Sequence, residues 1–216
     1  MMKVLMALFG LLLMVEGRAA DSLSGQQESH HWWSIDFGGP PYMVGWVENS
    51  TVEDIHGRFF DNGSGGAVGT TRLQADNEAA KGWPRVGGSV RPVIGADLPK
   101  RIYVRWQSVV ESQTYKVWVD IPDDARRLMR ASTLQQCTKL NRPPRFRAWL
   151  MVGVAPGGIV QVWVKDSCNE SIKVARAQAE VEARGPHLGK ANGNYYPQTE
   201  ASKQYVKKYG IPYGSW

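Results

Sequence analysis

The sequence predicts a mainly β protein, a β-rich α+β fold built as an antiparallel sheet or a two-sheet sandwich with two short helices. Apolar and polar residues alternate in the segments 101–107, 114–121 and 146–164, which is the period of half-buried strands. The first two segments are joined by VESQ, which is short enough for a hairpin. The pattern lacks the crossover helices that an all-parallel α/β sheet requires, so antiparallel strands are favoured.

The first third of the chain predicts irregular strands. An extended segment begins within HHWWSIDFGG, and PYMVGWVENSTVEDI alternates loosely between aromatic and β-branched residues, as a strand pair would. The next segment, GRFFDNGSGGAVGTT, is rich in glycine and too irregular for the interior of an element. We interpret it as a long loop or a distorted hairpin.

The two strands that follow have a sharper pattern. Their expected buried faces carry Ile102, Val104 and Trp106 in the first strand and Tyr115, Val117, Val119 and Ile121 in the second. Their opposite faces carry Tyr103, Arg105 and Gln107 in the first and Lys116, Trp118 and Asp120 in the second. Period-two alternation therefore predicts two half-buried strands.

A short helix is predicted near 122–132, because Pro122 and two acids precede an apolar set interleaved with arginines. A hairpin follows over 146–164, and its turn APGG supplies Pro156 and Gly157 at the positions of a type II turn. A buried row of valines leaves Trp149 and Trp163 on the other face of this hairpin.

The last third combines a strand with a helix. The period of SIKVARAQAEVEARG permits a strand or the start of a helix, and we favour the strand. A C-terminal helix is predicted near 199–209, because its tyrosines recur four residues apart and Gly210 and Pro212 are stop signals.

The N-terminus predicts export to the periplasm. Residues 1–19 have Lys3, a 12-residue apolar run from Val4 to Val15 and small residues after it, as a cleaved signal peptide does. That run is short of the ~20 residues that span a bilayer, so no transmembrane span is expected. Residues 20–31 are expected to be flexible and 32–216 to form a single β-rich domain. No cysteine directly follows the signal segment, and peripheral association with the envelope is left open.

The two cysteines, Cys137 and Cys168, are predicted to form a disulfide in an exported chain. The bridge would close a loop of about 32 residues, which stabilises the fold by roughly 3–4 kcal/mol. The alternatives are two buried thiols or an intermolecular link.

No enzyme motif is present, so we predict no enzymatic activity, no catalytic residue, no cofactor and no metal site. The four histidines form no HExxH or Cys/His metal pattern, and Ser64 lacks the context of a nucleophile elbow. The loop DNGSGGAVGTTRLQ has Arg72 where a calcium loop needs a carboxylate. The chain has 26 Lys and Arg against 20 Asp and Glu, but they are not clustered, which argues against nucleic-acid binding.

A tryptophan-rich face is the candidate docking surface for a protein partner. If the four alternating strands are neighbours, their second face gathers Tyr103, Arg105, Trp118, Arg147, Trp149 and Trp163, residue types that often anchor interfaces. Alternatively, that face is covered within a sandwich, and binding falls to the loop 58–69. The expected partner-binding residues are therefore Arg58, Phe59, Phe60, Arg105, Trp118, Trp149 and Trp163.

The segments RIYVRWQSVVESQTYKVWVDIP, ARRLMR, VGVAPGGIVQVWVKDSC and KYGIPYGSW resemble a family of small exported bacterial proteins of uncharacterised function, generally classed as lipoproteins. The resemblance covers about residues 98–216. It implies that the protein acts as a periplasmic immunity protein, which binds and inhibits a phospholipase effector of type VI secretion. This chain departs from the family in lacking the acylated cysteine. The alternative is an envelope protein that binds a glycan or lipid, or an envelope enzyme.

Overall fold

The computed structural model describes residues 33–70, 81–83, 90–134, 148–165 and 171–216. The predicted signal peptide, the 20–31 segment and the Cys137–Cys168 disulfide lie outside these residues, as do Arg72 and Arg147. Within the described residues, no helix has both the length and the apolar character needed to cross a membrane.

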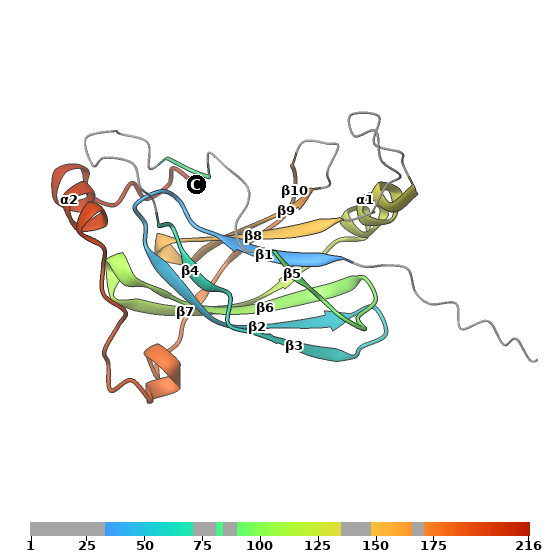
Figure 1. Ribbon diagram of the computed structural model, residues 1–216, viewed down its shortest axis with the longest axis horizontal. Coiled ribbons are helices and arrows are strands. Elements are labelled where there is room, and N and C mark those ends of the chain that lie inside the picture. Colours follow the sequence, from blue (N-terminus) through green and yellow to red (C-terminus); the bar gives the residue numbers. More distant parts are fainter. Residues whose placement is uncertain (1–32, 71–80, 84–89, 135–147, 166–170) are drawn as a thin grey trace, which may run out of the picture. The chain divides into compact units, whose positions relative to one another are not determined.

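The strands form two sheets that lie one above the other (Figure 1). Sheet A has the strand order β10-β9-β8-β1-β5, with bounds Ile172–Gln178, Ile159–Lys165, Trp149–Ala155, Ser34–Gly38 and Arg91–Pro92. Sheet B has the order β11-β7-β6-β2-β3, with bounds Glu180–Val181, Gln113–Asp120, Pro99–Ser108, Gly45–Asp54 and Phe59–Gly63, and β4 (Gly66–Val68) also pairs with β2. Among the described strands only β1 and β8 pair in parallel, so of the two predicted arrangements the antiparallel-dominated two-sheet sandwich is confirmed.

The core lies between the two sheets and follows the predicted alternation. Ile102, Val104 and Trp106 of β6 are almost fully buried, as are Leu150 and Val152 of β8. These side chains belong to one continuous apolar cluster. Burial of large aliphatic and aromatic side chains supplies about 1.5–3 kcal/mol each, so this shared interior holds the two sheets together.

The helix α1 (Asp123–Leu134) carries the chain from sheet B to sheet A. Its first turn contains two aspartates, and its apolar side chains Ala125 and Met129 are fully buried. The helix is thus confirmed where Pro122 and the acids predict it. The four predicted strands do not, however, lie side by side, because α1 separates β6 and β7 in one sheet from β8 and β9 in the other.

Two predictions about the strands are refined by the structure. The segment expected to be a strand pair is one long strand, β2, whose pairing with β6 is interrupted by bulges after Val47 and Glu53. The glycine-rich segment after it is a distorted hairpin, because β3 and β4 both pair with β2. The turn of the β8–β9 hairpin is confirmed, since Gly157 has φ 76° and ψ 8°, as a type II turn requires.

The C-terminal third contains the favoured strand and the predicted helix. The strand β10 pairs with β9 in sheet A, and the chain then enters sheet B as β11. The chain then makes a tight turn, η3 (Pro186–Gly189), in which His187 and Leu188 have positive φ. The helix α2 (Glu200–Tyr209) is capped by Thr199, whose side chain accepts from the Ser202 amide. The Tyr205 ring of α2 stacks on Tyr42 at 4.4 Å, which docks the helix as its tyrosine spacing predicts. A short 3₁₀ turn, η1 (Val109–Glu111), joins β6 to β7, and η2 (Pro156–Gly158) is the type II turn of the β8–β9 hairpin.

Candidate functional site

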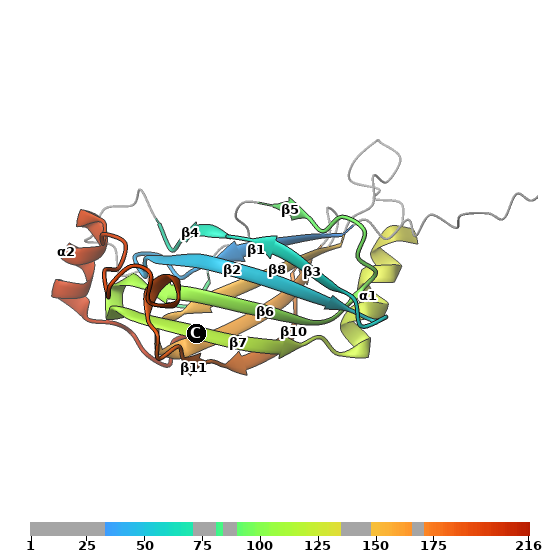
Figure 2. The same ribbon diagram turned by 90° about the horizontal axis from the view of Figure 1, so that it is seen from below.

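The outer face of sheet B is divided into a covered half and an open half. Figure 2 looks onto this face and shows η3 and the chain beyond it crossing one end of β2 and β6. At that end Glu48 and Gln107 are buried although they point away from the core. The other end carries exposed aromatic and charged side chains, which belong to β3, β6 and β7.

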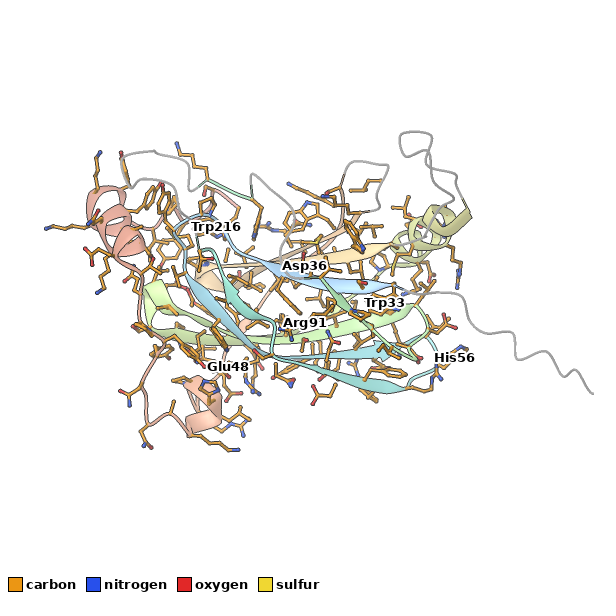
Figure 3. The ribbon with its side chains drawn as sticks, viewed as in Figure 1. Trp33, Asp36, Glu48, His56, Arg91 and Trp216 are labelled. Atoms are coloured by element: carbon orange, nitrogen blue, oxygen red, sulfur yellow. The ribbon has the colours of Figure 1, made fainter. Side chains whose placement is uncertain are left out.

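The covered half is held by polar contacts around Glu48. The carboxylate of Glu48, which Figure 3 labels, accepts from Arg105 Nε at 2.7 Å, Gln107 Nε2 at 2.8 Å and the His187 amide at 2.6 Å. Gln107 Oε1 in turn accepts from the amide of Tyr196, whose ring stacks on Trp46 at 4.3 Å. These bonds satisfy the buried polar groups, so this half of the face is closed by the chain itself.

The open half is built around Trp118. Its side chain is 36 % exposed, and Phe59 beside it is 60 % exposed. The Arg101 guanidinium lies 4.3 Å from the centre of the Trp118 ring, with Tyr103 at 5.3 Å and Phe59 edge-on at 6.1 Å. We call Phe59, Arg101, Tyr103, Lys116 and Trp118 the open face. It combines large apolar area with cations held against aromatic rings.

Charged side chains frame the open face in local pairs. Glu53 accepts from Lys100 Nζ at 2.9 Å and from Arg101 Nε, and these two hydrogen bonds hold the pKa of Glu53 below its ordinary value. On the other side, Lys116 Nζ lies 3.5 Å from Glu180 and 3.3 Å from Glu182.

Glu182 is almost fully buried and has cationic partners on two sides, Lys116 and Arg184. It accepts from Arg184, and that side-chain hydrogen bond is the main cause that lowers the pKa of Glu182 to about 2. An open cleft of about 430 Å³ lies between these groups and the aromatic rings. It is lined by Tyr103, Lys116, Val117, Trp118, Gln178, Glu180, Glu182 and Arg184.

The structure brings only part of the predicted partner-binding set to this place. Phe59 and Trp118 lie on the open face, and Arg58 lies near it, paired with Asp54 at 2.6 Å and 53 % exposed in its side chain. Phe60 packs against the core, and the Arg105 side chain is 14 % exposed because Glu48 holds it under the covered half.

The other two predicted residues, Trp149 and Trp163, belong to sheet A, so the expected single tryptophan face does not exist. Trp163 is 5 % exposed and meets Trp83 edge-on at 5.1 Å. Trp149 is half-buried, with Lys165 Nζ at 5.9 Å from its ring. The last residue, Trp216, is buried on the same side and donates from Nε1 to the Pro156 carbonyl at 3.0 Å (Figure 3). The alternative of a covered face thus holds for sheet A. The cover is formed by Trp83 and the C-terminal segment, and the second sheet does not form it.

Sequence reasoning missed most of the charged frame. Alternation does place Lys116 on the outward face of β7 with Trp118, but Lys116 is not among the expected partner-binding residues. Glu180, Glu182 and Arg184 gave no such signal, because the chain changes sheets between β10 and β11. Their proximity to Lys116 follows only from that crossing.

The other polar cluster of interest lies in the loop after β2. His56 Nε2 is 3.1 Å from Asp97 Oδ2, and the fully buried Asp54 accepts from the amides of His56, Arg58 and Asp97. These bonds fix the loop. In the ranges that the structure describes, no three His, Cys, Asp or Glu side chains are grouped as metal ligands.

Comparison with known proteins identifies a family. The model of DUF2931, described as a protein family of unknown function, matches residues 21–214. Neither the curated proteins nor the solved structures include a significant match to the chain.

Proposed function

Since the chain belongs to the DUF2931 family, whose function is unknown, we propose its function from its own surface and from the resemblance noted above: it is a periplasmic immunity protein that binds and inhibits a phospholipase effector of type VI secretion. In this proposal the protein is not an enzyme. It protects the producing cell by occupying the surface of the toxin, and the open face of sheet B is the part that binds.

The exposure of Phe59 and Trp118 is the observation that carries the proposal. Phe59 and Trp118 are exposed together on the same face of a sheet on which another outward aromatic, Trp46, is stacked against Tyr196. Exposed aromatic rings beside arginine are typical of residues that dominate the binding energy at protein interfaces. Burial of these rings by a partner would remove their apolar area from water.

Charge supports the same kind of partner. The full chain carries a formal net charge of +6, and it stays positive when the predicted signal peptide with Lys3, Glu16 and Arg18 is removed, which accelerates encounter with an acidic surface. The charged pairs around the open face are already formed in the free protein, so they need little rearrangement on binding. A preorganised rim of this kind favours a specific protein partner.

The test is co-expression of the exported chain with the phospholipase encoded beside its gene. We expect the two proteins to purify together and an equimolar amount of this chain to stop hydrolysis of phospholipid vesicles. If no phospholipase is encoded nearby, or if it is neither retained nor inhibited, the immunity function is wrong.

Two tryptophans provide a matched pair of variants. Trp118→Ala should weaken the complex by about 30-fold, the effect of a 2 kcal/mol interface anchor. Trp149→Ala removes the same side chain from the opposite sheet and should leave the affinity within about threefold. Equal effects of the two variants would place the binding surface elsewhere.

A further inference from the structure

The edge of sheet B beside the open face has unused backbone groups. In the β6–β7 ladder Arg101 lies opposite Asp120 and Tyr103 opposite Trp118. The amide of Ile121 donates to the Lys100 carbonyl of β6, whereas the Thr114 carbonyl accepts from the Glu182 amide on the opposite side. Successive residues of an antiparallel strand direct their backbone groups to opposite neighbours. The backbone groups of Lys116, Trp118 and Asp120 therefore point away from β6.

Only one end of this edge is paired with another strand in the described residues, and beyond that end β10 passes close to β7 without pairing with it. The strand β11 pairs with Tyr115 and Lys116, and the chain before it runs in sheet A as β10 (Figure 2). In the part of the chain that the structure describes, no strand pairs with the outer side of β7 at Trp118 or Asp120. Two N–H donors and two carbonyl acceptors thus face outward, with a spacing of ~6.8 Å between the two residues.

The open cleft of about 430 Å³ lies along this same edge. Its lining includes Val117 and Trp118 of β7 together with Gln178 and Glu180, the residues on either side of the point where the chain changes sheets. The cleft therefore offers space beside Trp118, the first of the two residues with outward backbone groups, and the Trp118 and Tyr103 rings provide an apolar surface next to it.

The corresponding edge of sheet A is defended against pairing. There β10 carries Lys173 and Arg176 and has a bulge between Lys173 and Ala175. Charged side chains and bulges on edge strands prevent association with other strands. The outer part of β7 also carries charged residues, Lys116 and Asp120, but it has a regular register with β6 and a large aromatic side chain, Trp118. The regular register and Trp118 thus distinguish the free end of β7 from the edge at β10, which its bulge protects against pairing.

We infer that the partner adds an extended segment to sheet B along β7, making backbone hydrogen bonds with Trp118 and Asp120 and placing an apolar side chain against Trp118 and Tyr103. Free N–H and carbonyl groups that alternate at strand spacing are matched by an extended polypeptide. The inference rests on the proposed function and specifies how the open face holds its partner. The β11 strand already uses the neighbouring groups of the same edge.

Backbone amide exchange in the complex tests this directly. The probe is the phospholipase encoded beside the gene, made inactive by substitution of its nucleophile and bound to the ¹⁵N-labelled chain. The amides of Trp118 and Asp120 should exchange rapidly in the free chain and at least ten times more slowly in the complex. The amides of Val117 and Val119, which face β6, should be protected in both.

The outcomes separate the two proposals. A complex in which Trp118 and Asp120 exchange as they do in the free chain overturns strand addition and leaves the immunity function intact. Failure to form any complex overturns the immunity function, and strand addition falls with it.

A pair of variants at one position gives a second measurement. Asp120→Pro removes an outward N–H and leaves the hydrogen bonds of β6 in place, because those come from the residues on either side. It should weaken the complex at least tenfold, whereas Asp120→Ala keeps the N–H and should stay within threefold. If both variants weaken binding equally, the side chain is responsible and strand addition is wrong. If Asp120→Pro fails to fold, the exchange measurement decides.

Discussion

The outer faces of the two sheets carry the same kind of residue in opposite situations. Trp163 points outward from β9 and Trp118 outward from β7, yet their exposures are 5 % and 36 %. The difference arises from what returns over each face. Trp83 and the C-terminal segment cover sheet A, whereas the 186–196 segment covers only one half of sheet B. A tryptophan on a polar strand face can therefore lie in a covered layer or on a binding surface. Which of the two applies depends on whether a distant part of the chain packs over that face.

The packing of Trp83 over sheet A requires a residue without a side chain at position 153. Gly153 lies between Trp83 and Trp163, and a Cβ atom there would be 2.6 Å from the first ring and 2.7 Å from the second. Such close approach is typical of a packed interior. The outer face of sheet A is thus a second, smaller core, while the open face of sheet B has no such partner in the described residues.

The largest effect on stability is expected from Trp163→Ala, which removes the covered tryptophan of sheet A. Loss of a buried tryptophan leaves a cavity, so the free energy of unfolding should fall by about 3–5 kcal/mol. Denaturant unfolding followed by circular dichroism measures the change, and the affinity of the folded fraction for the phospholipase should not change. A loss below about 1 kcal/mol would show that the ring is not packed as described.

A second way to sharpen the comparison is Gly153→Ala. The new methyl group overlaps the Trp83 and Trp163 rings, and overpacking of this kind costs about 1–3 kcal/mol. The matched control is Gly38→Ala, since Gly38 pairs with Gly153 across β1 and β8 and its Cβ would meet nothing within 4 Å. Equal unfolding free energies for the two variants would contradict the packing of Trp83 against sheet A.

The sequence predicts much of each strand but little of their arrangement. Alternation identifies the buried faces of β6 to β9 and the signals around Pro122 and Gly210 identify both helices, because these are local properties. The assignment of Trp118 and Trp163 to different sheets depends on the long connection through α1. No local sequence pattern shows which sheet a strand joins, because a strand has the same alternation of apolar and polar residues in either sheet.

The candidate site follows the same rule. Phe59 and Trp118 could be found as aromatic residues in polar surroundings, and the structure brings their rings together although β2 and β6 lie between their strands. The burial of Arg105 under the covered half could not be found, because its partner Glu48 and the amide of His187 are far apart in sequence. Contacts between residues so far apart in the sequence are determined by the fold as a whole.

A smaller effect is expected from the charged frame of the open face. The pKa of Glu182 is lowered to about 2, so its ionised form stabilises the fold fully above pH 4.5, and this stabilisation is lost as the pH falls towards 2. Glu182→Gln should flatten the decline of unfolding free energy over that range, and should cost about 1 kcal/mol at pH 7. The control Glu180→Gln changes a side chain that is 74 % exposed and should keep the wild-type decline. Thermal melts from pH 2 to pH 7 measure both.

The smallest effect on stability is expected from the residue that matters most for binding. Trp118 touches Arg101, Tyr103 and Phe59 on a surface, and its removal leaves no cavity in the core. Trp118→Ala should therefore change the unfolding free energy by less than about 1 kcal/mol, against about 3–5 kcal/mol for Trp163→Ala. For binding the order should be reversed, with Trp118→Ala weakening the complex more than Trp163→Ala does. A Trp118→Ala protein as unstable as Trp163→Ala would mean that the open face is a structural layer, and that the binding surface must be sought on another part of the molecule.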